Sequence, residues 1–445
     1  MDGWLTLRRV RPRVVVVAGW VVLVLGSGAR EHALARALAA DDAVDAVVAA
    51  PGNPGIDMIA RCEPLPDVTD ADAVLAIANR LAVDLVVIGP EAPLVAGVAD
   101  VLRDAGFLVF GPSAAAAQLE GSKAFAKEVM AAANVPTARA HVCTTPEEVD
   151  DALDDLGSPH VVKDDGLAAG KGVVVTNDLD EARTHAAACL AKPGGRVVVE
   201  EYLDGPEASV FCVTDGTTVL ALPPAQDFKR VGDGDEGPNT GGMGAYSPLD
   251  WAPADLADLV VERIAQPTID EIRRRGTPFV GALYVGLALT SKGPRVVEFN
   301  ARFGDPDGQV SLAKLRTPLG TLLHAAADGR LDEIDHLRID PAYAVNVVVA
   351  SNGYPAAPRT GDPIAGVESA ETVDDVYVLH AGTARDADGL LVSAGGRVLD
   401  VVATGATLAE ARDAAYRAVA EIQLEGGHHR TDITLAAQRG EVTIG

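Results

Sequence analysis

The chain has 445 residues, a formal net charge of −27 at pH 7 and an isoelectric point of about 4.6. This acidity argues against binding to nucleic acid, because such binding depends on Lys and Arg neutralising phosphates. An anionic substrate must therefore meet a local basic pocket rather than a basic surface. At roughly 150 residues per domain the length predicts about three domains. A content of 48% hydrophobic residues is enough for a packed α/β protein.

Residues 1–20 precede the first predicted strand. Arginines followed by the apolar run 14–25 resemble a secretion signal in outline, but the run is shorter than the roughly 20 residues that span a bilayer. Cleavage after residues 27–29 would also remove a strand that the first domain needs. We therefore expect a buried strand at 21–25 and no membrane partner. Residues 1–20 are expected to be a poorly ordered extension, which a start codon assigned too early would explain.

The cysteines, Cys62, Cys143, Cys189 and Cys212, are scattered and form no CxxC or Cys/His cluster. This spacing favours reduced, partly buried thiols over a disulfide framework or a zinc site. We expect a cytoplasmic protein that acts as a monomer.

A strand, the sequence GSGAREH at 26–32 and an Ala/Leu-rich helix form a βα arrangement typical of phosphate loops. Gly26 and Gly28 permit a tight turn, and the exposed N–H groups at the helix start favour a phosphate. The order resembles the dinucleotide fingerprint, but Glu31 stands where the third glycine would be, and Arg30 adds an anion partner. A nicotinamide-dependent dehydrogenase remains an alternative at this point.

Further strands are expected at 44–49, 83–88 and 107–110, separated by helical segments. The loop GPEAPL at 89–94 follows one of these strands at its carboxyl end, where open α/β sheets bind ligands. Glu91 in this loop is a candidate substrate contact, although a turn stiffened by proline would have the same sequence.

A Gly-rich loop between two short strands at 161–175 carries lysine at both ends, as Lys163 and Lys171. Glycine lets the backbone approach phosphates closely, and the lysines are available to neutralise the charge of a triphosphate. The loop is not a Walker A sequence, because GxxxxGK[ST] does not fit. We predict that it closes over a nucleotide. Its glycines include Gly166, Gly170 and Gly172.

The segment 197–205 predicts a strand that ends in a hinge, with Glu207 just after it. A passage between two lobes suits adenine, which needs backbone donors and acceptors, and a carboxylate such as Glu207 suits ribose hydroxyls. The polar segment 225–248 then predicts a loop of about 20 residues, and a loop of this length in a compact domain is usually functional or disordered. Because it carries Lys229, Arg230, an acid and a Gly-Gly pair, we favour a functional loop.

A helix expected at 252–275 and a strand at 279–290 lead to a second apolar strand. In that strand Glu298 and Asn300 are two residues apart, so their side chains share one face, while those of Val297 and Phe299 face away. Two oxygen ligands on one strand suit Mg²⁺, which takes few protein ligands and completes its shell with phosphate oxygens. A surface hairpin with incidental charges is the alternative. Downstream follow an anion-binding guanidinium and a further carboxylate, Arg302 and Asp305.

From residue 344 onward the pattern predicts a small α+β unit, with strands at 344–350, 376–380, 390–392 and 397–404 and a helix at 408–422. His380, the Gly395-Gly396 pair and Arg397 occur here without a coherent constellation. We expect a mainly structural unit that closes the substrate cleft.

Nine stretches occur in one order along the chain: GSGAREHALA (26–35), GPEAPLVAGV (89–98), QLEGSKAFAK (118–127), DGLAAGKGV (165–173), EEYLDGPEAS (200–209), KRVGD (229–233), GPNTGGMGAYSP (237–248), EFNARFGDP (298–306) and HAGT (380–383). Together they resemble the phosphoribosylamine–glycine ligases, also called glycinamide ribonucleotide synthetases, of the ATP-grasp superfamily. The resemblance runs from about residue 21 to about residue 420. It implies a Rossmann-like pre-ATP-grasp α/β domain at 21–121, a two-lobed ATP-grasp region at 122–343 with a smaller lid lobe at about 140–210, and a C-terminal α+β domain at 344–445.

The resemblance implies an ATP-dependent ligation of glycine to 5-phosphoribosylamine through glycyl phosphate, with Mg²⁺ or Mn²⁺ held by Glu298 and Asn300. The implied ATP-binding residues are Lys123, Lys163, Gly166, Gly170, Lys171, Gly172, Glu200, Glu201, Leu203 and Glu207. The predicted catalytic residues are Lys163, Arg302 and Asp305. The predicted substrate-binding residues are Gly26, Gly28, Arg30, Glu31, Glu91, Asp227, Lys229, Arg230, Asn239, Gly241, Gly242 and Met243.

The chain departs from the family pattern at a few positions. Asp164 stands where the family often has alanine, and Asp307-Gly308 replaces a more usual Glu-Thr. Asp307 keeps the charge but shortens the reach of the carboxylate, so it is not counted among the predicted contacts. Phe228 occupies a position that is histidine in some relatives, which argues against acid–base work there. Another ATP-grasp carboxylate–amine ligase or carboxylase and a non-catalytic nucleotide-binding protein are the alternatives.

Overall fold

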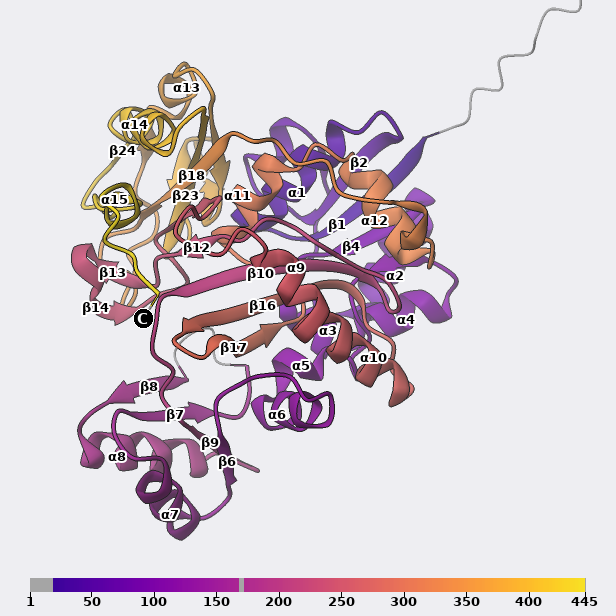
Figure 1. Ribbon diagram of the computed structural model, residues 1–445. Coiled ribbons are helices and arrows are strands. Elements are labelled where there is room, and N and C mark those ends of the chain that lie inside the picture. The colour runs from indigo at the N-terminus through magenta and orange to yellow at the C-terminus, as the bar shows by residue number, and fades with distance from the viewer. Residues whose placement is uncertain (1–18, 168–171, 445) are drawn as a thin grey trace, which may run out of the picture.

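The computed structural model describes residues 19–167 and 172–444 (Figure 1). They form an N-terminal α/β domain, a central region of two lobes and a C-terminal α+β domain, which confirms the predicted fold class. The predicted positions Gly170 and Lys171 lie outside the described residues, as do residues 1–18 of the expected extension.

The N-terminal domain contains a five-stranded parallel sheet in the order β3–β2–β1–β4–β5. Its strands are β1 (Trp20–Gly26), β2 (Val44–Pro51), β3 (Arg61–Cys62), β4 (Leu85–Ile88) and β5 (Leu108–Phe110). Trp20 was expected in the upstream extension, but it pairs with Val44 in the sheet. Its indole also stacks on the imidazole of His324, with ring centroids 4.0 Å apart. Trp20 therefore belongs to the domain.

Alternate residues of β1 pack into two different cores, as the period of a strand requires. Leu23 and Leu25 contact the core that α2 and α4 cover, whereas Val22 and Val24 pack with α1 and α12. Burial on both faces explains why the strand is apolar throughout. The helices around the sheet are α1 (Ala29–Ala39), the 3₁₀ turn Ile56–Met58, α2 (Ala71–Leu81), α3 (Glu91–Val95), α4 (Val98–Asp104) and, from far along the chain, α12 (Leu319–Ala327).

The lid lobe has an antiparallel sheet in the order β6–β9–β7–β8. Its elements are β6 (Ala140–Cys143), α7 (Pro146–Leu156), β7 (His160–Asp164), β8 (Val173–Thr176), α8 (Leu179–Leu190) and β9 (Val197–Glu200). A capping box starts α7: Glu148 N donates to Thr145 Oγ1 at 3.2 Å, and Thr145 N donates to Glu148 Oε2 at 3.3 Å. In β7, Val162 packs in the core of the lobe, while Val161 and Lys163 line a cavity on the other face.

The central lobe has an antiparallel sheet in the order β11–β10–β16–β17. Its elements are α5 (Gln118–Gly121), α6 (Lys123–Ala132), β10 (Glu207–Asp215), β11 (Val219–Ala221), α9 (Leu256–Val260), α10 (Gln266–Arg274), β16 (Val280–Thr290) and β17 (Gly293–Asn300). The helix predicted at 252–275 is confirmed from Leu256 to Arg274, where a π-helical segment at Val261–Ala265 joins α9 to α10. Pro267 lacks an N–H and its ring clashes with the carbonyl four residues earlier, so the α-helical ladder is interrupted there.

The C-terminal domain contains a five-stranded sheet in the order β12–β15–β18–β23–β20, covered by α14. Its elements are β12 (Gln226–Asp227), β15 (Gly244–Ser247), α11 (Asp307–Lys314), β18 (Tyr343–Ala350), α13 (Val367–Ala370), β20 (Val376–His380), β23 (Arg397–Gly405) and α14 (Leu408–Val419). α14 ends three residues before the predicted 422. Two strands of this sheet, β12 and β15, precede β18 by about 100 residues in the chain.

The prediction that 225–248 is a structureless loop is wrong. The segment contains β12, β15 and a hairpin between them. Its partner across the sheet, β18, lies far downstream, and no local pattern reveals such a pairing. The remaining short elements are β13 (Arg230–Gly232) with β14 (Glu236–Asn239), β19 (Ile364–Ala365) with β24 (Gln423–Leu424), β21 (Thr383–Arg385) with β22 (Leu391–Ser393), α15 (Leu435–Gln438) and the 3₁₀ turns Asp233–Asp235 and Leu331–Glu333.

Two further findings concern the whole described chain. Among residues 19–167 and 172–444, no helix combines the length and apolar character needed to cross a membrane. The four cysteines are free thiols, as predicted, and three of them are buried.

Asn53 joins the N-terminal and C-terminal domains. Its Nδ2 donates to the carbonyl oxygens of Ser27 and His380, both at 2.8 Å. Its Oδ1 accepts the main-chain N–H groups of Gly55 and Ile56, both at 2.9 Å. One side chain thus fixes the loop after β1 to the strand β20 of the other domain.

Two buried histidines complete this contact. The main-chain N–H of His380 donates to Nδ1 of His32 at 2.9 Å. Burial lowers the pKa of His32 to about 3 and that of His380 to about 4, so both rings are neutral near pH 7. A Cβ on Gly55 would lie 2.5 Å from each ring, so the close approach of the two domains requires glycine there.

Asn53→Ala should destabilise the protein, because the buried carbonyl of His380 would lose its donor and the buried N–H groups of Gly55 and Ile56 would lose their acceptor. Each unsatisfied buried group costs about 1–3 kcal/mol, so we expect a clear fall in melting temperature, measured by scanning calorimetry. Asn79→Ala, in an exposed position of α2, is the control and should leave the melting temperature nearly unchanged. Equal melting temperatures for the two variants would contradict the role given to Asn53.

Candidate active site

A cavity of about 260 Å³ lies between the lid lobe and the central lobe. Its lining includes Val161, Lys163, Val173 and Val175 of the lid, the hinge residues Glu200, Glu201, Tyr202 and Leu203, and a floor of Glu207, Asp227, Lys229, Asn239, Thr240, Tyr284, Val297, Glu298, Asn300, Arg302, Gly304, Asp305 and Asp307. A smaller cavity of about 90 Å³ shares part of this lining and adds Glu91, Glu120, Lys123, Lys127 and Gly166. Most of the predicted site residues are thus brought together.

Two lysines share one buried carboxylate. Lys163 Nζ lies 2.9 Å from Glu200 Oε2 and donates to the carbonyl oxygen of Val297 at 3.0 Å. Lys127 Nζ lies 3.3 Å from Glu200 Oε1. Burial lowers the pKa of Lys127 to about 8, despite the attraction of Glu200. Lys123 Nζ donates to the carbonyl oxygen of Gly166, at 3.1 Å, where the Gly-rich loop begins. Three amines therefore meet at the base of this loop.

The hinge side chains are already engaged. Glu200 faces the lysines, and Glu201 Oε2 lies 3.1 Å from Arg295 Nη2. An adenine at this hinge would therefore meet main-chain groups and the side chains of Tyr202 and Leu203 rather than the two carboxylates.

Two carboxylates lie beside the amine of Lys229 on the floor of the cavity. Lys229 forms an ion pair with Glu207, and Asp227 lies close by on β12. Burial alone would lower the pKa of Lys229, but the two carboxylates raise it well above its usual value, so the amine stays charged. Burial raises the pKa of Asp227 to about 7. Asp307, which sequence reasoning left out, also lines the cavity and accepts a hydrogen bond from Ser209 Oγ at 2.7 Å.

Strand β17 places Glu298 and Asn300 on the lining of both cavities, as their spacing predicted. The expectation for Val297 is wrong, because a β-bulge sets Val296 and Glu298 opposite consecutive residues of β16. Val296 is buried in the core, whereas Val297 lines the cavity and offers its carbonyl to Lys163.

Glu298 and Asn300 fit a divalent cation. The amide of Asn300 matches the acceptors around it when Nδ2 faces them. In that orientation Nδ2 donates to Glu120 Oε1 at 3.1 Å and to the carbonyl oxygen of Phe299 at 3.3 Å. That orientation leaves Oδ1 on the opposite edge of the amide, available to a metal. Among the described residues no three or more His, Cys, Asp or Glu side chains form a metal cluster. Two oxygen ligands are nonetheless in keeping with Mg²⁺, because phosphate and water complete its shell.

Arg302 lies between two carboxylates. Its Nη2 is 2.9 Å from Glu120 Oε1, and its Nε is 3.3 Å from Glu91 Oε2. Although burial would raise the pKa of Glu91, Arg302 and Arg30 together hold it below the usual value. Arg302 is thus fixed in the lining of both cavities as a positive charge.

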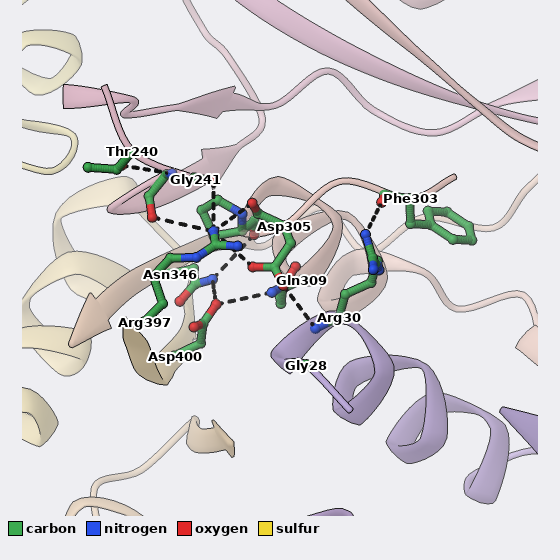
Figure 2. Close-up of polar contacts among 12 residues, drawn as sticks. Gly28, Arg30, Thr240, Gly241, Phe303, Asp305, Gln309, Asn346, Arg397 and Asp400 are labelled. Carbon is green, nitrogen blue, oxygen red and sulfur yellow. Dashed lines mark hydrogen bonds and ion pairs between the residues drawn. The ribbon is translucent and has the colours of Figure 1, made fainter. Parts of the chain in front are cut away.

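Asp305 lies where the three domains meet (Figure 2). Arg397 Nη1, from β23, lies 3.2 Å from Asp305 Oδ1 and also donates to the carbonyl oxygens of Asp305 and Gly241, at 2.8 and 2.7 Å. Behind this pair, Gln309 and Asn346 both donate to Asp400 Oδ2, at 3.0 and 2.7 Å. The C-terminal unit was predicted to lack a constellation, yet it supplies Arg397.

The predicted phosphate loop adjoins this junction. Arg30 N donates to Asp305 Oδ2 at 3.4 Å, and Arg30 Nη1 donates to the carbonyl oxygen of Phe303 at 3.3 Å. Glu31 accepts from Arg30 Nε and from Gly28 N, both at 2.6 Å. A phosphate at Gly26–Arg30 would therefore have to displace the Glu31 carboxylate, and its placement there stays a prediction.

Some predicted residues lie outside the two cavities. Arg230 Nη1 donates to the carbonyl oxygen of Gly237 at 2.7 Å within the β13–β14 hairpin, and the side chain of Met243 is fully buried. Sequence reasoning missed Lys127, although it follows Lys123 by four residues and so shares its helix face. It also missed Glu120, whose contacts with β17 are not visible from local sequence.

Comparison with known proteins gives consistent results along the chain. The N domain, the ATP-grasp (A) domain and the C domain of phosphoribosylglycinamide synthetase match residues 20–120, 121–308 and 344–436. A phosphoribosylamine–glycine ligase of Streptomyces coelicolor is 63% identical over 418 residues, covering 94% of this chain and 99% of that protein. One of Mycobacterium tuberculosis is 55% identical over 428 residues, covering 95% and 100%. The crystal structure of phosphoribosylamine–glycine ligase from Thermotoga maritima matches with a TM-score of 0.81 at 34% identity, covering 93% of this chain and 100% of that chain.

Glu200→Gln should destabilise the protein, because Lys163 and Lys127 would face each other without their shared carboxylate. Removing one partner of a buried ion pair costs about 3–5 kcal/mol. The double variant Glu200→Gln/Lys127→Met should recover part of this loss, since it removes one of the opposed charges. Urea unfolding of the single and double variants measures the coupling. Glu271→Gln, whose partner Arg274 is 71% exposed, is the control with a smaller expected loss. If the effects of the two substitutions on the free energy of unfolding are strictly additive, the result would contradict the pairing of Lys127 and Lys163 with one carboxylate.

Proposed function

The chain belongs to the phosphoribosylglycinamide synthetase family, and we propose that it joins glycine to 5-phosphoribosylamine with ATP as co-substrate. The products are glycinamide ribonucleotide, ADP and phosphate, in the biosynthesis of purines. The observation that carries the proposal is the likeness over nearly the whole chain to phosphoribosylamine–glycine ligases. Its cleft supports this with basic side chains close to Gly166, where the Gly-rich sequence begins, and with Glu298 and Asn300 on one strand. Family membership argues against the dehydrogenase alternative.

The reaction proceeds in two steps. A carboxylate oxygen of glycine attacks the γ-phosphorus of ATP, the bond to the bridging oxygen breaks, and ADP leaves with that oxygen. The amine nitrogen of 5-phosphoribosylamine then attacks the carbonyl carbon of glycyl phosphate, the carbon–oxygen bond to phosphate breaks, and the nitrogen loses a proton. Phosphoryl transfer needs alignment and charge neutralisation more than covalent help from the protein.

The basic residues of the cleft supply that neutralisation. Lys123, Lys127 and Lys163 meet at the start of the Gly-rich loop, where the phosphates of ATP would lie. Glu298 and Asn300 would hold Mg²⁺ or Mn²⁺, which when bound neutralises phosphate oxygens and aligns them. Arg302, held by Glu91 and Glu120, stabilises negative charge that develops on the transferred group.

The second half of the reaction needs a dry site, because acyl phosphates hydrolyse readily. The Gly-rich sequence 166–172, of which residues 168–171 lie outside the described part of the chain, is the segment predicted from sequence to cover the nucleotide. The acidic floor around Asp227 suits the ammonium group of glycine. Asp305, between the cavity and the loop at 26–31, lies where the amine substrate would approach the glycyl group. We further propose that the enzyme acts as a monomer in the cytoplasm.

Release of ADP tests the proposal directly. With Mg-ATP, glycine and freshly generated 5-phosphoribosylamine, release should require all three components, each omitted in turn. Release that does not depend on glycine would instead indicate another ATP-grasp ligase or a carboxylase. Binding of ATP without any release would indicate a non-catalytic nucleotide-binding protein.

Lys163→Ala should lower kcat by at least about 100-fold, in line with the loss of one donor to a developing charge. The fold should remain intact, which circular dichroism checks. Lys292→Ala, in the exposed turn between β16 and β17, should retain full turnover. A folded Lys163→Ala variant with turnover near that of the wild type would remove Lys163 from the catalytic residues.

A further inference from the structure

We propose that Glu120 is a positioning residue, which orients the metal ligand Asn300 and the guanidinium of Arg302 through one carboxylate. The proposal rests on the ATP-dependent function proposed above. Glu120 belongs to the stretch QLEGSK, whose lysine has a predicted role at the ATP phosphates but whose glutamate has none. Glu120 would thus act on the reaction through Asn300 and Arg302 rather than by touching substrate.

The carboxylate of Glu120 contacts three consecutive residues at the end of β17. Oε2 accepts the main-chain N–H of Ala301 at 2.7 Å. Oε1 lies 2.9 Å from Arg302 Nη2 and, with the Asn300 amide oriented so that its nitrogen faces Glu120, 3.1 Å from Asn300 Nδ2. The side chain is only 7% exposed, so water does not compete freely for these bonds. Helix α5, which carries Glu120, packs directly against β17.

The contact with Asn300 has a chemical consequence. A carboxylate is an acceptor only, so it selects the amide orientation in which nitrogen faces Glu120. The amide oxygen then lies on the other edge, and oxygen is the atom that Mg²⁺ or Mn²⁺ takes. An Asn300 side chain in the opposite orientation would present N–H groups to the cation. Outer-shell partners of this kind orient metal ligands in proteins generally.

The contact with Arg302 shares the same oxygen. Arg302 has a second carboxylate, Glu91, whose side chain is 30% exposed and which contacts Nε rather than Nη2. The hydrogen bonds of the Asn300 amide go to Glu120 and to the carbonyl oxygen of Phe299, and none goes to Glu91. The two carboxylates therefore give a matched pair: loss of either disturbs Arg302, but only the loss of Glu120 frees the amide of Asn300.

The test is the affinity for Mn²⁺ in the presence of a non-hydrolysable ATP analogue, measured by electron paramagnetic resonance of the free ion. Glu120→Gln keeps the size of the side chain, but its amide nitrogen cannot accept, so the three donors are no longer all satisfied. We expect the Mn²⁺ affinity to fall at least tenfold. The affinity for the analogue without metal should change less than threefold.

Three further variants bound the result. Asn300→Ala removes the ligand and sets the largest loss expected. Glu91→Gln should retain the Mn²⁺ affinity, because it leaves Asn300 in place. Glu63→Gln removes another buried carboxylate that pairs with two arginines, in the N-terminal domain, and should change neither metal affinity nor turnover.

Glu120→Asp tests the position of the carboxylate at constant charge. It also replaces Glu120→Gln in the test if that variant does not fold. It keeps the charge but shortens the reach by one methylene, so we expect a loss of Mn²⁺ affinity here too. Wild-type affinity in folded Glu120→Gln, full affinity in Glu120→Asp, or an equal loss in Glu91→Gln would each overturn the proposal. Because metal–nucleotide binding requires no glycine, a failure of the ligase assay leaves this result readable on its own.

Discussion

The arrangement of the cleft depends on one constraint, which is that buried charged side chains pair with side chains of opposite charge. Three basic groups of the cleft are held by carboxylates, Lys163 and Lys127 by Glu200 and Arg302 by Glu91 and Glu120, whereas Lys123 donates to the carbonyl oxygen of Gly166. A buried charge without a partner would cost several kcal/mol, on the order seen when one member of a buried pair is removed. The pairs therefore keep the cations charged and in place before ATP arrives. In a chain with a net charge of −27, the cleft brings several cations together where an anion must bind.

The same pairing joins parts of the chain that lie far apart. Asp305 follows β17, but its carboxylate contacts Arg30 of the first domain and Arg397 of the last. The C-terminal sheet takes β12 and β15 from the segment between two strands of the central lobe, and α12 completes the core of the N-terminal sheet. The three domains are thus interleaved. This arrangement suits a reaction with three substrates, because each domain contributes side chains to one junction.

Within this frame the chemistry divides between two sets of side chains. The lysines, Glu298, Asn300 and Arg302 face the two joined cavities and suit ATP and a metal. The floor around Asp227 and the junction at Asp305 suit the two amine substrates, glycine and 5-phosphoribosylamine. Strand β17 connects both sets, and its bulge at Val297 turns a main-chain carbonyl toward Lys163. The bulge in this one strand therefore shapes the wall of the cavity beside Lys163.

The sequence by itself determined the features that depend on short-range order. The two-residue spacing placed Glu298 and Asn300 on one face, the Gly-rich loop with its lysines indicated a nucleotide, and nine ordered stretches indicated the family. Tertiary structure alone decided the rest: the pairing of β15 with β18, the bulge at Val297, and the contacts of Glu120 and Arg397. The reason is physical. Periodicity and turn chemistry act over a few residues, whereas strand partners and buried ion pairs are chosen by the packing of segments about 100 or more residues apart.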